Sequence, residues 1–335
     1  MNKEITHEEK FFIAGSTGMV GSSIIRKLKE KGYGNKDYGG EILAPNRNEL
    51  NLLDLVEVKN WFELHKPSVV ILAAAKVGGI IANSSYPFDF IFENIKIQNN
   101  VIEAAWLNNV KRFVFLGSSC IYPKFAKQPI VEESLLTGEL ENTNEPYAIA
   151  KISGIKLCES LRKQYGFDAI SLMPTNLYGP HDNYHQQNSH VMASLVRKFC
   201  EAELYKQPTV TCWGSGKPER EFMHVDDLSE AVIFCLEKWN PNKSNAPKDQ
   251  AGNPLYFLNV GTGEDISILR LSEIISMEVG YQGKVIWDQS KPDGTPKKQL
   301  NVEKLKSLGW SPRIDLNDGI ASTIRDFQAT HLEKT

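Results

Sequence analysis

A glycine-rich turn near the N-terminus, G-S-T-G-M-V-G at residues 15–21, constrains the fold of this chain more than any other feature. It follows a short apolar strand expected at residues 11–14 and opens a helix expected at residues 20–31. Glycines at this spacing let the backbone turn tightly and approach a pyrophosphate, to which the next helix presents its N-terminal N–H groups. We therefore predict that the turn binds a dinucleotide, with a purely structural turn as the alternative.

Apolar strands and helices alternate through the first half of the chain. We expect strands at residues 11–14, 41–44, 69–73, 112–116 and 169–173, and helices at residues 20–31, 55–65, 90–108 and 147–165. This alternation is typical of an α/β fold with a doubly wound parallel sheet, in which right-handed crossovers place helices on both faces. The first half therefore predicts a Rossmann domain.

The pattern changes after the fifth expected strand. Glycine, proline, asparagine and histidine are frequent in residues 176–190, and the later strands and helices are irregular. We expect residues 1–175 to form the Rossmann domain and residues 176–335 to form mainly a smaller C-terminal substrate-binding lobe. Residues 225–240 are expected to return to the first domain as a helix, and residues 240–254 to form an exposed loop.

The end of the second strand indicates which dinucleotide binds. An NAD site usually has an acidic residue there, whereas this chain reads A-P-N-R-N at residues 44–48. Arg47, next to Asn46, can pair with a 2′-phosphate, so we predict NADP, with a solvated loop charge as the alternative. Asp54 either accepts a hydrogen bond from the adenine amino group or caps the following helix.

Tyr147 and Lys151 lie four residues apart on an expected helix and therefore share one face. A nearby ammonium stabilises a phenolate, so we expect Lys151 to lower the pKa of Tyr147. A tyrosine tuned in this way can exchange a proton with a carbonyl or alcohol oxygen while hydride moves at carbon. The alternative is an amphipathic helix with an interfacial tyrosine and an exposed lysine.

The string L-G-S-S-C-I-Y-P at residues 116–123 follows a strand at the sheet edge where open α/β sheets bind ligands. Ser118 there can hydrogen-bond the same substrate oxygen as Tyr147. If the run stays extended, Ser118 and Cys120 face the same side and Ser119 faces away. The alternative for Cys120 is a small buried apolar residue.

Composition excludes several classes of protein. The formal net charge of -3 and the lack of a long basic block argue against a nucleic-acid partner. No apolar stretch approaches the roughly 20 residues that span a bilayer, and the N-terminus has no apolar signal core. The five cysteines are scattered, which argues against a disulfide framework or a metal site. We expect a cytoplasmic protein with no membrane partner.

Several strings along nearly the whole chain are long and specific. They are A-A-A-K-V-G-G-I (73–80), L-G-S-S-C-I-Y-P (116–123), N-E-P-Y-A-I-A-K (144–151), M-P-T-N-L-Y-G-P-H-D-N (173–183), N-S-H-V (188–191), W-G-S-G-K-P-E-R-E-F-M-H-V-D-D (213–227) and K-P-D-G-T-P (291–296). Together they resemble the extended short-chain dehydrogenase/reductase family. The resemblance is greatest to its NADPH-dependent members that convert GDP-4-keto-6-deoxy-D-mannose to GDP-L-fucose, by epimerisation at carbons 3 and 5 and reduction at carbon 4.

The resemblance implies a role for each reactive side chain. Cys120 and His190 would transfer the protons of the two epimerisations, and both side-chain types can titrate near neutral pH. Tyr147 would stabilise the oxygen on carbon 4 and protonate it on reduction, and Ser118 would complete that oxygen site. Lys151 would hold the nicotinamide ribose.

Binding residues are also implied. For NADP we expect Gly15, Ser16, Thr17, Gly18, Met19, Val20, Gly21, Asn46, Arg47, Asp54, Leu116, Gly117, Lys151, Pro174, Thr175, Asn176, Leu177 and His190. For the GDP-sugar we expect Lys198, Trp213, Arg220 and Asp293, with core packing and loop capping as the alternatives for Trp213 and Asp293. Bacterial relatives commonly have His-Arg in place of Ser16-Thr17, and relatives often have arginine in place of Lys198. His224 is expected to be structural.

Other assignments stay open at this point. Synthesis of GDP-L-colitose from GDP-4-keto-3,6-dideoxymannose would use the same scaffold and only one epimerisation. A silent sugar-nucleotide-binding regulator is disfavoured by the intact reactive side chains, and a UDP-hexose 4-epimerase would show no net use of NADPH. The family also implies a homodimer, formed through a four-helix bundle of the helices at residues 90–108 and 147–165.

Overall fold

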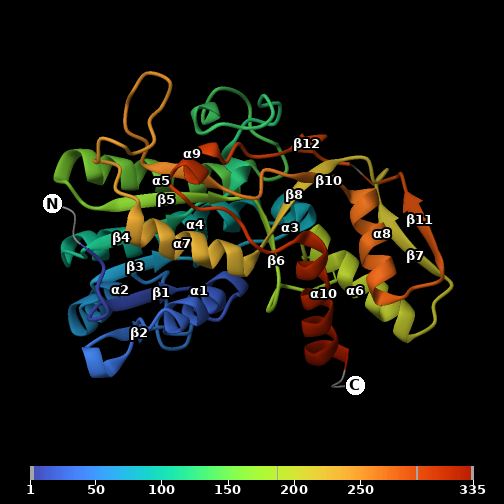
Figure 1. Cartoon of the computed structure of the whole chain (residues 1–335), viewed down its shortest axis with the longest axis horizontal. Helices are drawn as coiled ribbons and strands as arrows, with labels where there is room; N and C mark the ends of the chain where they lie inside the picture. The colour runs from blue at the N-terminus through green and yellow to red at the C-terminus, as the bar shows by residue number, and fades with distance from the viewer. Residues whose placement is uncertain (1–3, 187, 292, 333–335) are drawn as a thin grey trace.

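A twisted parallel sheet of six strands forms the centre of the first lobe in the computed structural model, which describes residues 4–186, 188–291 and 293–332 (Figure 1). The strand order is β2 (Glu41–Leu43), β1 (Lys10–Ala14), β3 (Val69–Leu72), β4 (Arg112–Leu116), β5 (Ala169–Pro174) and β9 (Phe257–Val260), and every neighbouring pair is parallel. Strands β2 and β3 flank β1, so the chain changes direction across the sheet at β1. Such a switch point opens a crevice at the carboxyl ends of the strands.

Helices cover both faces of this sheet. One face packs against α2 (Leu55–His65), α4 (Pro87–Leu107) and α5 (Glu145–Tyr165), and the other against α1 (Met19–Glu30) and α7 (Val225–Lys238). Successive side chains of β1 alternate between the two cores, with Phe12 in the first and Phe11 and Ile13 in the second. The prediction of an α/β fold with a doubly wound parallel sheet is confirmed.

The second lobe combines short strands with three helices. Its strands are β6 (Asn176–Tyr178), β7 (Thr209–Trp213), β8 (Glu219–His224), β10 (Asp265–Ser267), β11 (Lys284–Asp288) and β12 (Lys297–Lys298). The helices α6 (Val191–Leu204), α8 (Ile268–Val279) and α10 (Leu316–Phe327) enclose a third apolar core with these strands, and a π-helical turn η4 (Gln328–Leu332) follows α10. The remaining short helices are α3 (Ile80–Ser85) and α9 (Glu303–Ser307).

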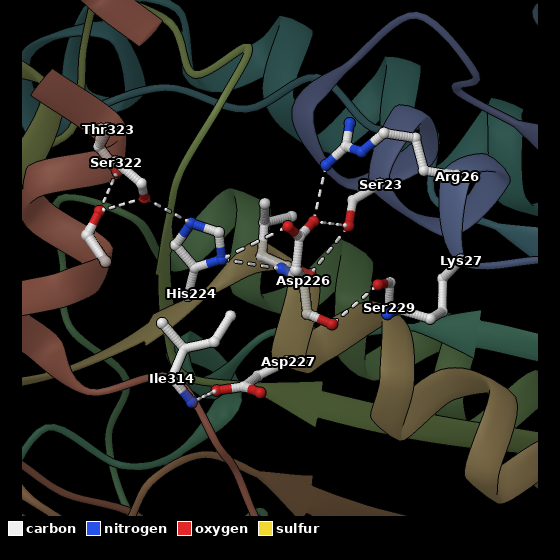
Figure 2. A network of polar contacts seen from close by, with 12 residues as sticks. Ser23, Arg26, Lys27, His224, Asp226, Asp227, Ser229, Ile314, Ser322 and Thr323 are labelled. Carbon is white, nitrogen blue, oxygen red and sulfur yellow. Dashed lines mark hydrogen bonds and ion pairs between the residues drawn. The ribbon is translucent and has the colours of Figure 1, made fainter. Parts of the chain in front are cut away.

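A polar network joins the two lobes at the start of α7 (Figure 2). Asp226 accepts hydrogen bonds from Ser23 and Arg26 of α1, each at 2.6 Å. His224 caps α7 by accepting the N–H of Asp226, and its other ring nitrogen lies 3.5 Å from the Ser322 hydroxyl of α10. His224 is buried, and its position fits the expected structural role.

The division at residue 175 stays a prediction, because the chain crosses between the lobes more than once. Helix α7 packs on α1, and β9 adds a sixth strand to the central sheet although both lie in the second half of the sequence. Within the described residues, no helix is both long and apolar enough to cross a membrane.

Candidate active site

A cavity of about 870 Å³ opens at the carboxyl ends of the central strands and continues between the lobes. The glycine-rich turn and the ends of β3, β4 and β5 line one part of it. The start of α6 and the strands β7 and β8 line the other part. All of the site residues predicted from the sequence line this cavity, with the exception of Asp54.

The glycine-rich turn has the geometry of a phosphate cradle. Gly15 has a φ of +85°, and a Cβ there would lie 2.8 Å from the Ala74 nitrogen. A Cβ on Gly21 would lie 2.7 Å from the Gly15 carbonyl carbon, so α1 packs directly on the turn. Gly18 precedes α1 with no side-chain cap. The first N–H groups of α1 therefore face the cavity and are available to a pyrophosphate.

Ser16 ties this turn to the end of β2. Its hydroxyl donates to the carbonyl oxygens of Ala44 and Pro45, each at 3.1 Å. Arg47 lies beyond Pro45, is exposed, and has no ion pair with any described residue. Its guanidinium is therefore available to a charged ligand at this end of the cavity.

Two further side chains of this region accept hydrogen bonds from backbone N–H groups. The Asn46 side chain accepts the N–H of Asn48 at 2.8 Å and so shapes the turn that carries Arg47. Asp54 caps α2 by accepting the N–H groups of Val56 and Glu57. The structure thus shows the capping role, in which one carboxylate oxygen takes part, and the adenine contact stays a prediction.

The serine–cysteine segment after β4 is not extended. Residues Ser119–Ile121 form a 3₁₀ turn, and the Ser118 hydroxyl caps it by accepting the N–H of Cys120 at 3.3 Å. The expectation that Ser118 and Cys120 share a side because of strand alternation is therefore wrong in its premise. Ser118, Ser119 and Cys120 all line the cavity, although Ser119 and Cys120 are largely buried.

The pKa of Tyr147 differs from the one expected from the sequence. The Lys151 ammonium donates to the Leu116 carbonyl oxygen at 2.9 Å and lies 5.8 Å from the centre of the Tyr147 ring. Burial lowers the pKa of Lys151 to about 8. Burial raises the pKa of Tyr147, the Cys120 charge raises it further, and a hydrogen bond with Ser118 opposes this. The expected lowering of the Tyr147 pKa is not what the structure shows, because desolvation by burial is the largest effect on this hydroxyl.

Cys120 and His190 approach the cavity from opposite lobes. Burial raises the pKa of the Cys120 thiol, while Lys298 and Ser118 favour the thiolate. His190 precedes α6 at its N-cap position. Its ring is exposed to the cavity, yet the protein crowds around it, and this desolvation together with the Lys298 charge lowers its pKa. At neutral pH the two groups are therefore a thiol and a neutral imidazole, one able to give a proton and the other to accept it.

Polar and aromatic side chains gather at the far end of the cavity. The Lys198 ammonium donates to the Thr211 carbonyl oxygen at 2.8 Å and lies 5.5 Å from the centre of the Trp213 ring, which is 49% exposed. Asp293 accepts the N–H and the hydroxyl of Ser215 at 2.7 and 2.8 Å. Trp213 thus offers an open ring face, whereas Asp293 already caps a loop.

Arg220 and the turn after β5 complete the lining. The Arg220 side chain donates to the Glu219 carbonyl oxygen at 2.8 Å, and burial lowers its pKa. Residues Pro174, Thr175, Asn176 and Leu177 lie at the end of β5 and the start of β6, as expected for a turn that contacts a cofactor.

Lys298 is a cavity residue that the sequence did not reveal. It pairs in register with Arg220 through β12 and β8, and its charge acts on Cys120 and His190. Glu221, which is fully buried, holds this region by accepting the N–H groups of Leu300 and Thr262, both at 2.7 Å. The only signal in the sequence was the position of this lysine, two residues after the K-P-D-G-T-P string.

Among the described residues, no group of three or more metal-ligating side chains occurs that could hold an ion.

Comparisons with known proteins agree with this geometry. The family model of the NAD dependent epimerase/dehydratase family matches residues 11–246. A GDP-L-fucose synthase of Escherichia coli is 52% identical, with 96% of this chain and 97% of that protein covered. GDP-L-fucose synthase 1 of Arabidopsis thaliana is 50% identical over 94% of this chain and 91% of that protein. A GDP-L-colitose synthase of Yersinia pseudotuberculosis is 36% identical over 95% and 97%.

Solved structures show the same fold. A GDP-6-OMe-4-keto-L-xylo-heptose reductase from Campylobacter jejuni superposes with a TM-score of 0.89 at 33% identity, covering 98% of this chain and all of that one. A GDP-mannoheptose C4 reductase from the same organism, with NADP bound, superposes with a TM-score of 0.85 at 33% identity, covering 97% of this chain and 99% of that one.

Proposed function

The chain belongs to the NAD dependent epimerase/dehydratase family, and from this premise we propose that it converts GDP-4-keto-6-deoxy-D-mannose to GDP-L-fucose with NADPH. One observation carries the proposal. A single cavity holds Ser118, Tyr147 and Lys151, which suit carbonyl reduction, together with Cys120 and His190, which suit proton transfer. A reductase that did not epimerise would have no need of the last two.

Epimerisation follows from the chemistry of a ketone. The keto group at carbon 4 acidifies the hydrogens on carbons 3 and 5, so one residue can remove such a proton and leave an enolate. The Tyr147 and Ser118 hydroxyls donate hydrogen bonds to the enolate oxygen. Return of a proton to the opposite face inverts the carbon, and Cys120 and His190, which reach the cavity from different lobes, are the pair that can serve both faces. No redox change accompanies these steps.

Reduction then uses the same oxygen site. NADPH, when bound, supplies the hydride that carbon 4 receives. Tyr147 donates its proton to the oxygen on that carbon, and its high pKa keeps the hydroxyl protonated until then. The Lys151 ammonium is held by the carbonyl oxygen of Leu116, at the carboxyl end of β4. From this position we assign it to the nicotinamide ribose.

The residues present fit NADP. The cradle formed by Gly15, Gly18 and Gly21 brings backbone N–H groups to a pyrophosphate, and a side chain at Gly15 or Gly21 would collide with backbone. Arg47 has no ion pair within the described chain and lines the cavity just after β2, which supports its pairing with a 2′-phosphate. NADP is accordingly the cofactor, and Arg47 is the residue we assign to its 2′-phosphate.

The alternative of GDP-L-colitose synthesis has weaker support. The curated relative with that name is 36% identical, whereas relatives named GDP-L-fucose synthase reach 50% and 52%. The two reactions differ at carbon 3, which carries a hydroxyl only in the fucose precursor. Turnover of the ketone that carries a hydroxyl on carbon 3, compared with turnover of the 3,6-dideoxy ketone, therefore separates them.

Three assignments beyond the chemistry are part of the proposal. Residues 1–175 would carry most of the NADP site, and residues 176–335 most of the GDP-sugar site. We place the enzyme in the cytoplasm, because all five cysteines are free thiols.

We also propose a homodimer formed through α4 and α5. Phe88 and Phe92 stack at 5.0 Å on α4 and are exposed, as is Ile149 on α5. Exposed apolar side chains gathered on two adjacent helices favour an interface between copies of the chain. Sedimentation of the protein, compared with a Phe92→Asp variant, tests this: the variant should sediment as a monomer.

A direct assay tests the function. The purified protein is given GDP-4-keto-6-deoxy-D-mannose with NADPH or NADH, the loss of reduced nicotinamide is followed by absorbance, and the sugar is identified by NMR. We expect GDP-L-fucose, formed with a lower KM for NADPH. Turnover only with the 3,6-dideoxy ketone would contradict the assignment and favour the colitose reaction.

A further inference from the structure

A second cavity of about 720 Å³ lies on the other side of the loop that borders the active site. Its walls are the loop at residues 181–186, helix α6, and the end of α10 with η4. Asp182, Asn183 and Gln186 line both cavities, so the loop is a shared wall. A cavity of this size can hold a small organic ligand.

Arg197 is the unusual residue of this second cavity. It projects from α6, lines the cavity and is only 8% exposed. No hydrogen bond or ion pair joins it to any other described residue, and its Nε is buried without a partner. Buried charges in proteins are normally paired, because an unpaired one loses its hydration without compensation. The guanidinium therefore points to an anion that the cavity receives.

Other polar atoms of the cavity are unpartnered as well. The Tyr184 hydroxyl is buried without a hydrogen bond, in a residue that is 6% exposed. One carboxylate oxygen of Asp182 is also buried and unpartnered, and burial raises the pKa of this carboxyl to about 7. Near neutral pH Asp182 can thus either donate or accept a hydrogen bond. Buried groups of this kind are satisfied in most proteins, so a ligand that supplies the missing partners is expected.

The rest of the lining consists of aromatic rings together with Glu201 of α6 and Leu332. Tyr184 packs on Phe327 at 4.6 Å between ring centres, and Phe327 stacks on the His331 imidazole at 5.0 Å. Tyr184 also meets His331 edge-on at 5.0 Å, and His331 is exposed at the cavity. Tyr184 and Phe327 are themselves buried, so the exposed His331 imidazole is the part of this cluster that a ligand ring can meet, next to a cation and hydrogen-bonding groups.

We propose that this second cavity binds a nucleoside phosphate, with Arg197 on the phosphate and His331, which packs on Tyr184 and Phe327, against the base. Asp182 and the amides of Asn183 and Gln186 supply the hydrogen bonds for the polar edge of the base or the ribose. The ligand would share a wall with the active site. Helix α6, which follows His190, also carries Lys198, which lines the active site.

Equilibrium titration with GDP tests the proposal. The protein is first saturated with NADP⁺, so that GDP meets only the GDP-sugar site and the second cavity. We expect two equivalents of GDP in the unaltered protein, and one in both Arg197→Met and Arg220→Met. The equivalent that Arg197→Met keeps should be displaced by the GDP-sugar, and the one that Arg220→Met keeps should not. Binding of a single equivalent, unchanged in Arg197→Met, would overturn the proposal.

Controls separate charge from folding. Lys206→Met removes a positive charge from an exposed position beyond α6 and should keep both equivalents. Arg197→Met should keep KM and kcat for the GDP-sugar, because Arg197 does not line the active site. Tyr184→Phe, which loses only a hydroxyl, should weaken the second equivalent about tenfold, in line with one lost hydrogen bond.

Competition by three further ligands identifies which chemical groups the second cavity recognises. GMP should compete for the second equivalent, whereas guanosine and inorganic phosphate should each compete at least tenfold more weakly. Equal competition by inorganic phosphate would show an anion site without base recognition and would refute the nucleoside part. The outcome does not depend on the proposed function, because the Arg220→Met protein reports the second cavity even if the active site takes another sugar.

Discussion

The glycine-rich turn provides a prediction in which two nearby glycines tolerate a methyl group to very different degrees. A Cβ at Gly21 would lie 2.7 Å from the Gly15 carbonyl carbon and 2.9 Å from the Ser16 Cα, and closer still to the Gly15 oxygen. A Cβ at Gly18 would lie no nearer than 3.6 Å to any atom, and Gly18 has a φ of -80°, which any residue adopts. Gly21→Ala should therefore disrupt the turn, whereas Gly18→Ala should fit it.

The expected changes in the free energy of unfolding depend on which atoms the added Cβ would contact. Backbone cannot rotate away as a side chain can, so Gly21→Ala must displace α1 from the turn, and overpacking of this kind costs about 1–3 kcal/mol. For Gly18→Ala, the poorer N-cap costs about 0.5 kcal/mol. Alanine also reduces the conformational freedom of the unfolded chain, which stabilises the folded state by about 0.4–1 kcal/mol. The free energy of unfolding should thus be almost unchanged in Gly18→Ala.

Thermal unfolding without cofactor is the assay. We expect the Tm of Gly21→Ala to fall by several degrees, since about 1 kcal/mol shifts a large domain by roughly 2–4 °C, and the Tm of Gly18→Ala to stay within one or two degrees. Titration with NADPH then shows whether a methyl group at Gly18 reaches the pyrophosphate. Equal stability of the two variants, or a larger loss in Gly18→Ala, would refute the geometry of the turn.

The remaining predictions concern the reactive groups. Cys120→Ser should slow inversion at one or both carbons by about 10²–10⁴-fold, the usual contribution of a positioned acid or base, as measured by the stereochemistry of the product sugar over time. Arg47→Ala should raise KM for NADPH by about tenfold, the scale of one exposed charge-assisted contact, and leave KM for NADH unchanged; an equal rise for both cofactors would contradict the 2′-phosphate assignment. The Lys151 ammonium loses its proton as pH rises through about 8. NADPH affinity should then fall above pH 8, and fluorescence titration should find a flat profile in Lys151→Met.

Regular local patterns made much of the first lobe predictable. The five predicted strands and the helices of the first half occur within a few residues of their expected positions, because each has its own apolar pattern and its own ending. Helix α4 begins at Pro87 and not at Phe90, since proline fits the first turn of a helix. The second lobe offered no such signals: its strands are two to six residues long and pair with distant segments.

The active site shows where sequence reasoning ends. Ser118 and Cys120 could be named from their place after β4, but not the 3₁₀ turn that sets their directions, because one side-chain cap decides between turn and strand. The pKa of Tyr147 depends on burial that only the folded chain creates. Lys298 reaches the cavity because β12 pairs with β8, two segments that lie about 80 residues apart in the sequence. No local sequence pattern predicts this contact.

Reaction in deuterated water tests most directly the claim that one cavity performs both epimerisations and the reduction. Each inversion exchanges a carbon-bound hydrogen with solvent, so GDP-L-fucose formed from GDP-4-keto-6-deoxy-D-mannose and NADPH should carry deuterium at carbons 3 and 5 and protium at carbon 4. NMR of the product gives all three positions at once. Deuterium at carbon 5 alone, with carbon 3 not inverted, would contradict the account and indicate a single epimerisation.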